Sequence, residues 1–361
     1  MVRTKIVAGG SAWSAAPVLV MILSLGFASS SVAQVSNAPQ TPPTPQAGAA
    51  SQPSSAPQPS SAAQTAPART SSDADTAALE SLLDRAAATA PGTYVVTGSS
   101  LAPEPSAISV ALQADVLRGA QNAIRVPVVV GALVTRPAMV RVRIVSTAGG
   151  APRIVDAGSG SAEPGIVRLV RDFTLSPAEY EIHAVVGERR GDTLVAALAK
   201  RQIAVPDIWS APLAVTPIVI GDSVANRERA EDKPFIFGPS ALTPAISPQF
   251  SQNGAMNVAF RVYNWAADST ETPEAAKPDV TVEYVFYEQR SNRMTFFNKM
   301  KPQRLGEKLA AGFTPASGMV TAGMMVPLAS FPIGDFELRV RVTDNRSKRT
   351  AEQRVVFTVG P

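Results

Sequence analysis

Apolar and polar residues alternate with a period of two through most of the chain beyond residue 93. In the first half of this region the apolar positions are Ile124, Val126, Val128 and Val130, then Val140, Val142 and Ile144, then Tyr180, Ile182, Ala184 and Val186, and finally Ile203 and Val205. In the second half they fall within 256–262, 280–286, 320–328, 336–342 and 357–359. Short alternating runs between Gly, Pro, Asn and Asp predict antiparallel strands with one face in a core.

Each half closes with the same phrase. Residues 177–186 run from a proline into an alternating strand, and a polar turn leads to a second strand at 201–206. Residues 332–342 and 354–361 repeat this order. The repeat predicts an all-β protein of two tandem antiparallel immunoglobulin/fibronectin-like sandwiches, at 93–207 and 212–361.

Tyr180 favours the immunoglobulin-like version of this fold. A Pro-x-x-Tyr-x-apolar phrase that opens a late strand allows the tyrosine hydroxyl to bond back to the backbone at a corner. The second unit has Phe336 at this position, which packs but cannot make that bond. The chain has no cysteine, so the disulfide core of an antibody domain is excluded.

Three segments precede the sandwiches. Residues 1–33 combine an early basic stretch, an apolar run and a small-residue cleavage site, the pattern of a secretory signal peptide. Residues 34–74 are rich in Pro, Ala, Ser and Gln and predict a disordered tether. Residues 75–90 predict a short helix with acidic residues at its start and Pro91-Gly92 after it. We therefore expect a periplasmic or secreted protein, which contacts a membrane only if the signal segment is uncleaved.

Charge and composition narrow the possible functions. The formal net charge is +4, and removal of Arg3 and Lys5 with the signal peptide leaves 31 basic and 29 acidic residues. This near balance gives no support for nucleic-acid binding. The absence of cysteine removes thiolate catalysis and cysteine-based metal sites.

Catalytic chemistry finds little support. His183 is the single histidine and lies out of phase with the core positions of its strand, so we expect it at the surface. A histidine-based zinc site lacks ligands, and no loop has the glycine spacing that cradles phosphate. Acidic residues such as Glu283 and Glu288 are interpreted as lying on the solvent-facing side of a strand. A hydrolase site with two facing carboxylates is the alternative interpretation. We predict no enzyme activity, no metal and no cofactor.

Aromatic and arginine side chains are the candidate binding residues. Tyr263, Trp265 and Tyr287 are placed to stack against a sugar if they are exposed, and core packing is the alternative. Arg339 and Arg341 share one strand face, as do Arg141 and Arg143; such arginines either bind an acidic polymer or solvate an outer face. Trp209, in the connector between the halves, is interpreted as a wedge between them.

Three phrases, at 203–207, 213–221 and 331–344, resemble the C-terminal accessory region of exported acidobacterial proteins that carry a von Willebrand factor A-related domain. The resemblance covers about 165–361 and implies a secreted, non-enzymatic pair of β-sandwiches. The Asp-x-Ser-x-Ser loop of the A domain is missing, because Asp156, Ser159 and Ser161 have the wrong spacing. No adhesion-site residue is carried over.

The sequence therefore predicts a non-enzymatic interaction or structural module, with an envelope or extracellular protein as partner and no nucleic acid. The binding candidates are Tyr263, Trp265, Tyr287, Arg339 and Arg341. The alternative function is a carbohydrate-binding sandwich that uses exposed aromatics of the second unit on a polysaccharide.

Overall fold

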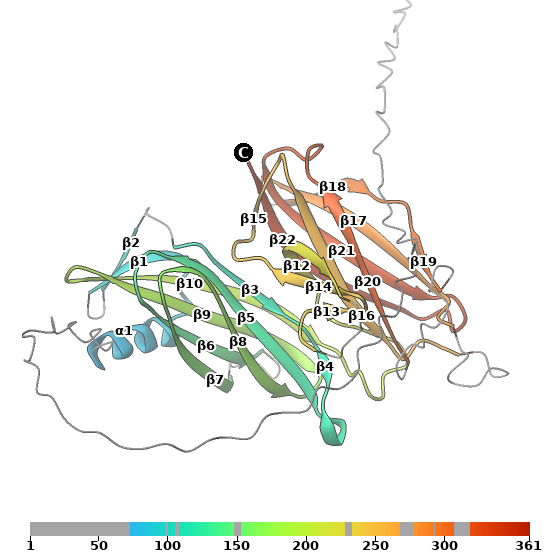
Figure 1. Cartoon of the computed structure of the whole chain (residues 1–361), viewed down its shortest axis with the longest axis horizontal. Coiled ribbons are helices and arrows are strands. Elements are labelled where there is room, and N and C mark those ends of the chain that lie inside the picture. Colours follow the sequence, from blue (N-terminus) through green and yellow to red (C-terminus); the bar gives the residue numbers. More distant parts are fainter. Residues whose placement is uncertain are drawn as a thin grey trace, which may run out of the picture. The chain divides into compact units, whose positions relative to one another are not determined.

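The computed structural model describes residues 73–97, 100–104, 108–147, 153–227, 233–267, 277–291, 293–306 and 318–361 (Figure 1). All of them belong to one compact unit, Pro67–Pro361. The predicted signal peptide, 1–33, lies outside the described residues, as does the predicted tether up to residue 72. The described part is all-β with one α-helix, as predicted, and its strand pairings are antiparallel except that of β15 with β22.

The helix α1, Asp73–Asp84, begins two residues before the predicted start and ends six before the predicted end. Asp73 and Asp75 stand in its first turn, where carboxylates interact favourably with the helix dipole. Leu79, Leu82 and Leu83 form its buried face. That face packs against apolar residues of β1, β6, β9 and β10, so the helix covers one side of a sheet.

Two sheets enclose the first core. One has the order β2 (Ser100–Pro103), β1 (Gly92–Thr97), β10 (Thr193–Val205), β9 (Ala178–Arg190), β6 (Ala138–Ser146) and β7 (Arg153–Ala162). The other has the order β3 (Val110–Ala114), β5 (Ile124–Val134) and β4 (Leu117–Arg118), with β8 (Gly165–Leu175) also on β5 and the 3-10 turn η1 (Ala120–Asn122) after β4. The predicted alternating positions of β5, β6 and β9 are buried together, which confirms the period-two reading there.

Two further sheets enclose the second core. One has the order β11 (Ala214–Val215), β16 (Ala255–Tyr263), β12 (Val219–Asn226), β14 (Ser240–Pro244) and β13 (Ile236–Phe237), with β20 (Met319–Pro327) on β16. The other, here called sheet D, has the order β15 (Gln249–Ser251), β22 (Thr350–Gly360), β21 (Gly334–Asp344), β17 (Val280–Arg290) and β18 (Arg293–Lys299), with β19 (Gln303–Leu305) also on β17. Aromatic rings fill this core: Phe331 lies 5.2 Å from both Phe286 and Phe336, centroid to centroid.

Tyr180 makes the predicted corner bond. Its hydroxyl donates to the Ser176 carbonyl oxygen at 2.9 Å, and its ring is buried in the first core. Phe336, the counterpart in the second half, is buried with no hydroxyl to place. The two halves thus use the same phrase, but only the first adds a hydrogen bond to it.

Polar side chains also link the two halves. Asp115, after β3, forms an ion pair with Arg261 of β16, and both side chains are excluded from solvent. Arg118 places its guanidinium 4.8 Å from the Trp209 ring centroid and 5.0 Å from that of Tyr263. Trp209 is 37% exposed and contacts Arg118 of the first half, which in turn contacts Tyr263. The interpretation of Trp209 as a wedge between the halves stays a prediction. The predicted domain boundaries, 93–207 and 212–361, stay a prediction.

Candidate functional site

The outer face of sheet D carries a row of side chains in register across four strands, with apolar or aromatic residues at three positions and Glu337 at the fourth. Val356 of β22 pairs with Glu337 of β21, which pairs with Tyr287 of β17, which pairs with Phe296 of β18. Val356 is 61% exposed and Phe296 56%. The Tyr287 and Phe296 rings meet edge to face with centroids 6.4 Å apart, so the row continues to the side of the sheet.

Arginine side chains border this row. The Arg339 guanidinium lies 4.3 Å from the Tyr287 ring centroid, and its Nε donates to Glu337 Oε1 at 2.5 Å. The hydrogen bond to Glu337 raises the pKa of Arg339, which therefore stays charged. Arg341, two residues further along β21, donates to Glu352 at 3.3 Å. Three of the five predicted binding residues, Tyr287, Arg339 and Arg341, thus share one solvent-facing surface.

The other two predicted binding residues are elsewhere. Tyr263 is 1% exposed and Trp265 7%, and each belongs to a hydrophobic core. The condition that sugar binding placed on these two rings, exposure, is therefore not met, and the core-packing alternative holds for both. The chain after β16 is held in place by Asp344, which accepts from Ala266 N–H. A buried ring cannot stack against a sugar from outside, so the carbohydrate-binding alternative loses its central residue.

Strand β18 forms one side of sheet D. It pairs with β17, and no described strand pairs with its other edge. Arg290 and Arg293 are paired across a two-residue loop, with Ser291 at a positive φ of 47°. So short a loop requires that this pair exchanges both hydrogen bonds, and the bonding then alternates along the strand. The backbone groups of Met294 and Phe296 consequently point away from β17, toward the open edge.

From the sequence, residues 292–318 are interpreted as a long insertion in the second unit, rich in Lys and Arg. This segment contains β18 and β19, and its residues 307–317 lie outside the described part of the chain. Sequence reasoning treated this region as a loop and missed Phe296. The pattern was visible: Met294 and Phe296 alternate with polar Thr295. The adjacent Phe297 obscured it, since a register shift opposite Phe286 and Tyr287 lets Phe297 pack against the core while Phe296 faces out.

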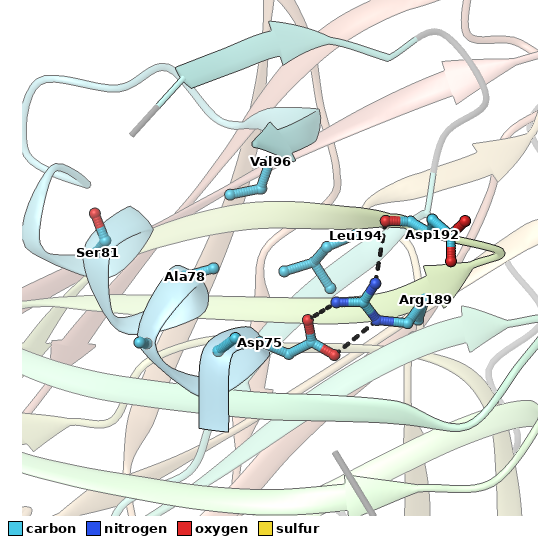
Figure 2. Close-up of a pocket in the computed structure, with 9 residues that line it drawn as sticks. Asp75, Ala78, Ser81, Val96, Arg189, Asp192 and Leu194 are labelled. Atoms are coloured by element: carbon cyan, nitrogen blue, oxygen red, sulfur yellow. Dashed lines mark hydrogen bonds and ion pairs between the residues drawn. The ribbon is translucent and has the colours of Figure 1, made fainter. Parts of the chain in front are cut away.

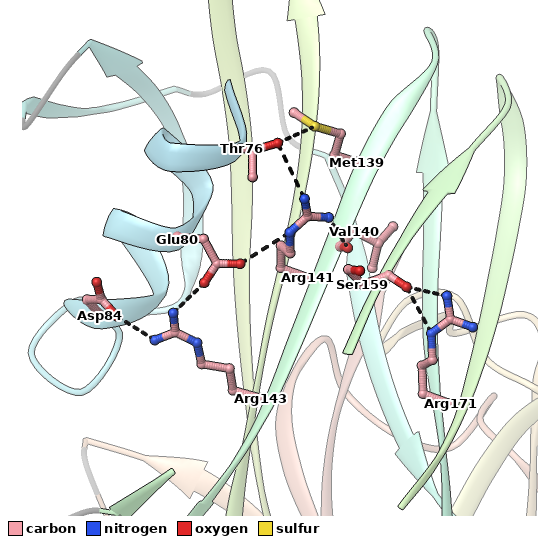
Figure 3. Close-up of polar contacts among 9 residues, drawn as sticks. All are labelled: Thr76, Glu80, Asp84, Met139, Val140, Arg141, Arg143, Ser159 and Arg171. Carbon is pink, nitrogen blue, oxygen red and sulfur yellow. Dashed lines mark hydrogen bonds and ion pairs between the residues drawn. The ribbon is translucent and has the colours of Figure 1, made fainter. Parts of the chain in front are cut away.

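Arg141 and Arg143 do not form a free outer face. Glu80 of α1 lies between them, 3.2 Å from Arg141 Nε and also paired with Arg143 (Figure 3). Arg143 Nη1 donates to Asp84 at 2.6 Å. The interpretation of these arginines as solvating groups or as a polymer site is replaced by a structural one, because α1 covers their strand.

His183 is also not at the surface. It is 3% exposed, and its Nε2 lies 2.5 Å from Glu181 Oε2. Strand β9 is central in its sheet, and α1 packs over the side that strand periodicity assigns to solvent. The prediction of a surface histidine is wrong for that reason.

A pocket of about 430 Å³ opens between α1 and the β9–β10 hairpin (Figure 2). Arg189 donates to both carboxylate oxygens of Asp75 and to the Asp192 carbonyl oxygen at its rim. The rest of the lining is mainly small or apolar, including Ala78, Val96 and Leu194. Arg189 is thus engaged by Asp75 and by the backbone of Asp192, so its charge is already paired at this pocket.

In the described ranges no three His, Asp or Glu side chains cluster in a way that could hold a metal ion. Among the helices described there, none is long and apolar enough to cross a membrane. The chain matches no family model and no curated protein. The resemblance to von Willebrand factor A-associated accessory regions stays a prediction.

Proposed function

We propose that this chain is a non-enzymatic interaction or structural module that acts outside the cytoplasm and binds an envelope or extracellular protein through the outer face of sheet D. The observation that carries the proposal is the in-register row of Val356, Tyr287 and Phe296. Exposed apolar side chains that gather on one face of a protein often mark a binding surface. Here Tyr287 and Phe296 are neighbours, and Glu337 lies between them and Val356. Aromatic residues and arginine are also enriched at protein interfaces.

The fold proposed for this module is a tandem of two immunoglobulin/fibronectin-like sandwiches. Two observations support this fold. Each half has its own hydrophobic core between strands of antiparallel sheets. The Tyr180 hydroxyl also bonds to the Ser176 carbonyl oxygen in the manner of a tyrosine corner. Immunoglobulin-like folds occur widely as recognition modules at cell surfaces. The fold is therefore compatible with a binding role, but it does not specify one. The exposed row on sheet D is the feature that points to a particular binding surface.

The extracytoplasmic location rests on the sequence. Residues 1–33 have the pattern of a signal peptide, and residues 34–74 have the composition of a tether. A tether of this kind would give the folded part reach from an anchored or secreted N-terminal segment. The cysteine-free chain would be held by its cores rather than by disulfides.

A capture experiment with the full chain tests the proposal. Envelope extract and purified envelope polysaccharides are passed over wild type, Phe296→Asp and Ile166→Asp; Ile166 is 61% exposed on β8, in the other half, and serves as the matched control. We expect one defined protein to bind wild type and Ile166→Asp but not Phe296→Asp, with thermal melts showing that all three fold. Equal capture by Phe296→Asp would contradict the assignment to this face, and capture of polysaccharide alone would favour the sugar-binding alternative.

A further inference from the structure

We infer that the partner binds by strand addition: an extended peptide segment with carboxylates at its ends and apolar residues at alternate positions pairs with the open edge of β18. This inference rests on the proposed function, since it names how the partner of sheet D is bound. Three observations on β18 carry it, namely the backbone edge, the apolar side chains and the charge.

The backbone edge is the first observation. The main-chain groups of Met294 and Phe296 face away from β17, and no described strand occupies that side. Such groups are a ready template for another extended chain, whose main chain would supply the missing hydrogen bonds. The regular stretch ends where the register shifts opposite Phe286 and Tyr287, so the template is short.

The apolar side chains are the second observation. Met294 and Phe296 are both exposed, at 38% and 56%, and both stand on the outer face of the sheet. A strand added beside β18 would place its own alternate side chains next to them, since side chains of paired strands meet across the sheet. Alternating apolar residues in the partner would therefore extend the row that Tyr287 and Phe296 begin.

Charge is the third observation and it selects the partner. Residues 293–301 contain Arg293, Lys299 and Lys301 and no acidic residue. Glu288 on the neighbouring strand is already bonded to Arg290 at 2.6 Å, and no described carboxylate forms an ion pair with the three cations. An acidic segment could form ion pairs with all three cations. Its carboxylates would have to lie at its ends, because Arg293 begins β18 while Lys299 and Lys301 lie at and after its end.

A second copy of this chain fits poorly at the same edge. Pairing of two β18 strands would bring two sets of the same three cations together with no acidic residue from either. Like charges on adjacent strands destabilise their pairing. A heterologous acidic strand is thus the occupant that the observations favour.

Synthetic peptides test the inference directly. A fluorescent peptide of alternating valine and threonine flanked by aspartates is titrated with the full chain at low salt, beside a peptide flanked by lysines. Exposed ion pairs contribute up to about 1 kcal/mol each, so three of them should favour the acidic peptide by about tenfold or more. The preference should weaken as salt is added. Equal binding of the two peptides, or binding of neither, would overturn the inference.

Variants of the chain test the contributions of the β18 backbone edge and of its charged residues separately. Met294→Pro removes one edge-facing N–H while the bonds to β17 remain, and it should abolish peptide binding. Replacement of Arg293 and Lys299 by glutamate should reverse the preference between the peptides. Ile166→Asp, on β8 in the other half of the chain, should leave peptide binding unchanged.

Two measurements keep the test independent of whether Met294→Pro folds. An acidic peptide N-methylated at alternate residues cannot donate to β18 and should not bind wild type; its binding would contradict strand addition. Sedimentation of wild type should show no dimer, and a dimer lost in Met294→Pro would make a second copy the occupant instead. If protein capture depends on Phe296 but the peptides fail, the outer-face proposal stands and the strand-addition inference falls.

Discussion

Asp115 and Arg261 form an ion pair in which both side chains are excluded from solvent, although 145 residues separate them in sequence and they belong to different halves of the chain. Asp115 also accepts from the N–H groups of Val116 and Phe235. The Arg261 guanidinium donates to the Ile236 carbonyl oxygen at 2.6 Å and lies 4.5 Å from the Phe237 ring centroid. The Asp115 carboxylate thus accepts from two backbone N–H groups as well as from Arg261, whereas Arg261 donates through its two terminal nitrogens and its buried Nε has no hydrogen-bond partner in the described part of the chain.

Removal of one partner of this pair should destabilise the whole compact unit. Arg261→Met leaves Asp115 buried beside two backbone N–H groups but without its countercharge, and we expect a loss of about 3–5 kcal/mol in the free energy of unfolding. Asp115→Leu combined with Arg261→Met should lose less than the sum of the single changes, because no lone charge remains. Urea denaturation measures these values.

The control for that prediction is the exposed pair Arg125–Asp172, whose atoms approach to 2.8 Å. Arg125→Met should change the unfolding free energy by less than about 1 kcal/mol. Similar losses for the buried and the exposed pair would show that the interior pair does not hold the halves together.

The Tyr180 corner should contribute a measurable hydrogen bond. Tyr180→Phe keeps the ring in the first core and removes the donor to Ser176, so a loss of about 0.5–1.5 kcal/mol is expected. Tyr94→Phe removes a similar bond, to the Ala90 carbonyl oxygen, at an exposed site where water can replace it. Chemical unfolding of both variants checks the difference, and an equal or smaller effect at Tyr180 would speak against a structural corner.

Helix α1 should loosen when Arg143 is removed. The Arg143 side chain is 11% exposed and pairs with both Glu80 and Asp84. Arg143→Ala should increase amide hydrogen exchange in residues 73–86 while exchange in sheet D is unchanged, because the helix has lost two ion pairs to the sheet. Arg341→Ala, which removes an exposed pair with Glu352, is the matched control. Unaltered exchange in the helix would mean that its leucines alone hold it.

Glu188 should make the free energy of unfolding depend on pH in the acidic range. Burial on its own raises the pKa of Glu188, but the hydrogen bonds from Arg190 and Thr135 outweigh it and hold the pKa below the ordinary 4.5. A lowered folded-state pKa gives stability that is present above 4.5 and is lost as the pH falls through the folded-state value.

The Glu188→Gln variant tests this sign. It should be less stable than wild type at neutral pH, and its unfolding free energy should fall less steeply between about pH 5 and pH 3. Thermal melts across that range measure both curves. Parallel curves would show that another carboxylate governs the acid dependence.

Strand periodicity was sufficient to predict much of the fold. Val126, Val128 and Val130 are buried on one side of β5 because side chains of a strand alternate between its faces, and this local rule needs no knowledge of the rest of the chain. Asp73 and Asp75, together with the leucines that follow them, similarly predicted a helix close to the observed α1. The Pro-x-x-Tyr phrase anticipated the bond from Tyr180 to Ser176 for the same reason, since its two ends are four residues apart.

Tertiary structure decided what lies over each face. Periodicity placed His183 and Arg143 on the outer side of their strands, but the packing of α1 on that side covers both. Trp265 likewise ends a strand in the sequence, yet contacts from distant segments enclose it in the second core. Phe296 was hidden in a presumed loop, and only its pairing with Tyr287 shows it to be part of an exposed row. The sequence by itself determined which residues alternate, while long-range packing determined which of the outward side chains meet solvent.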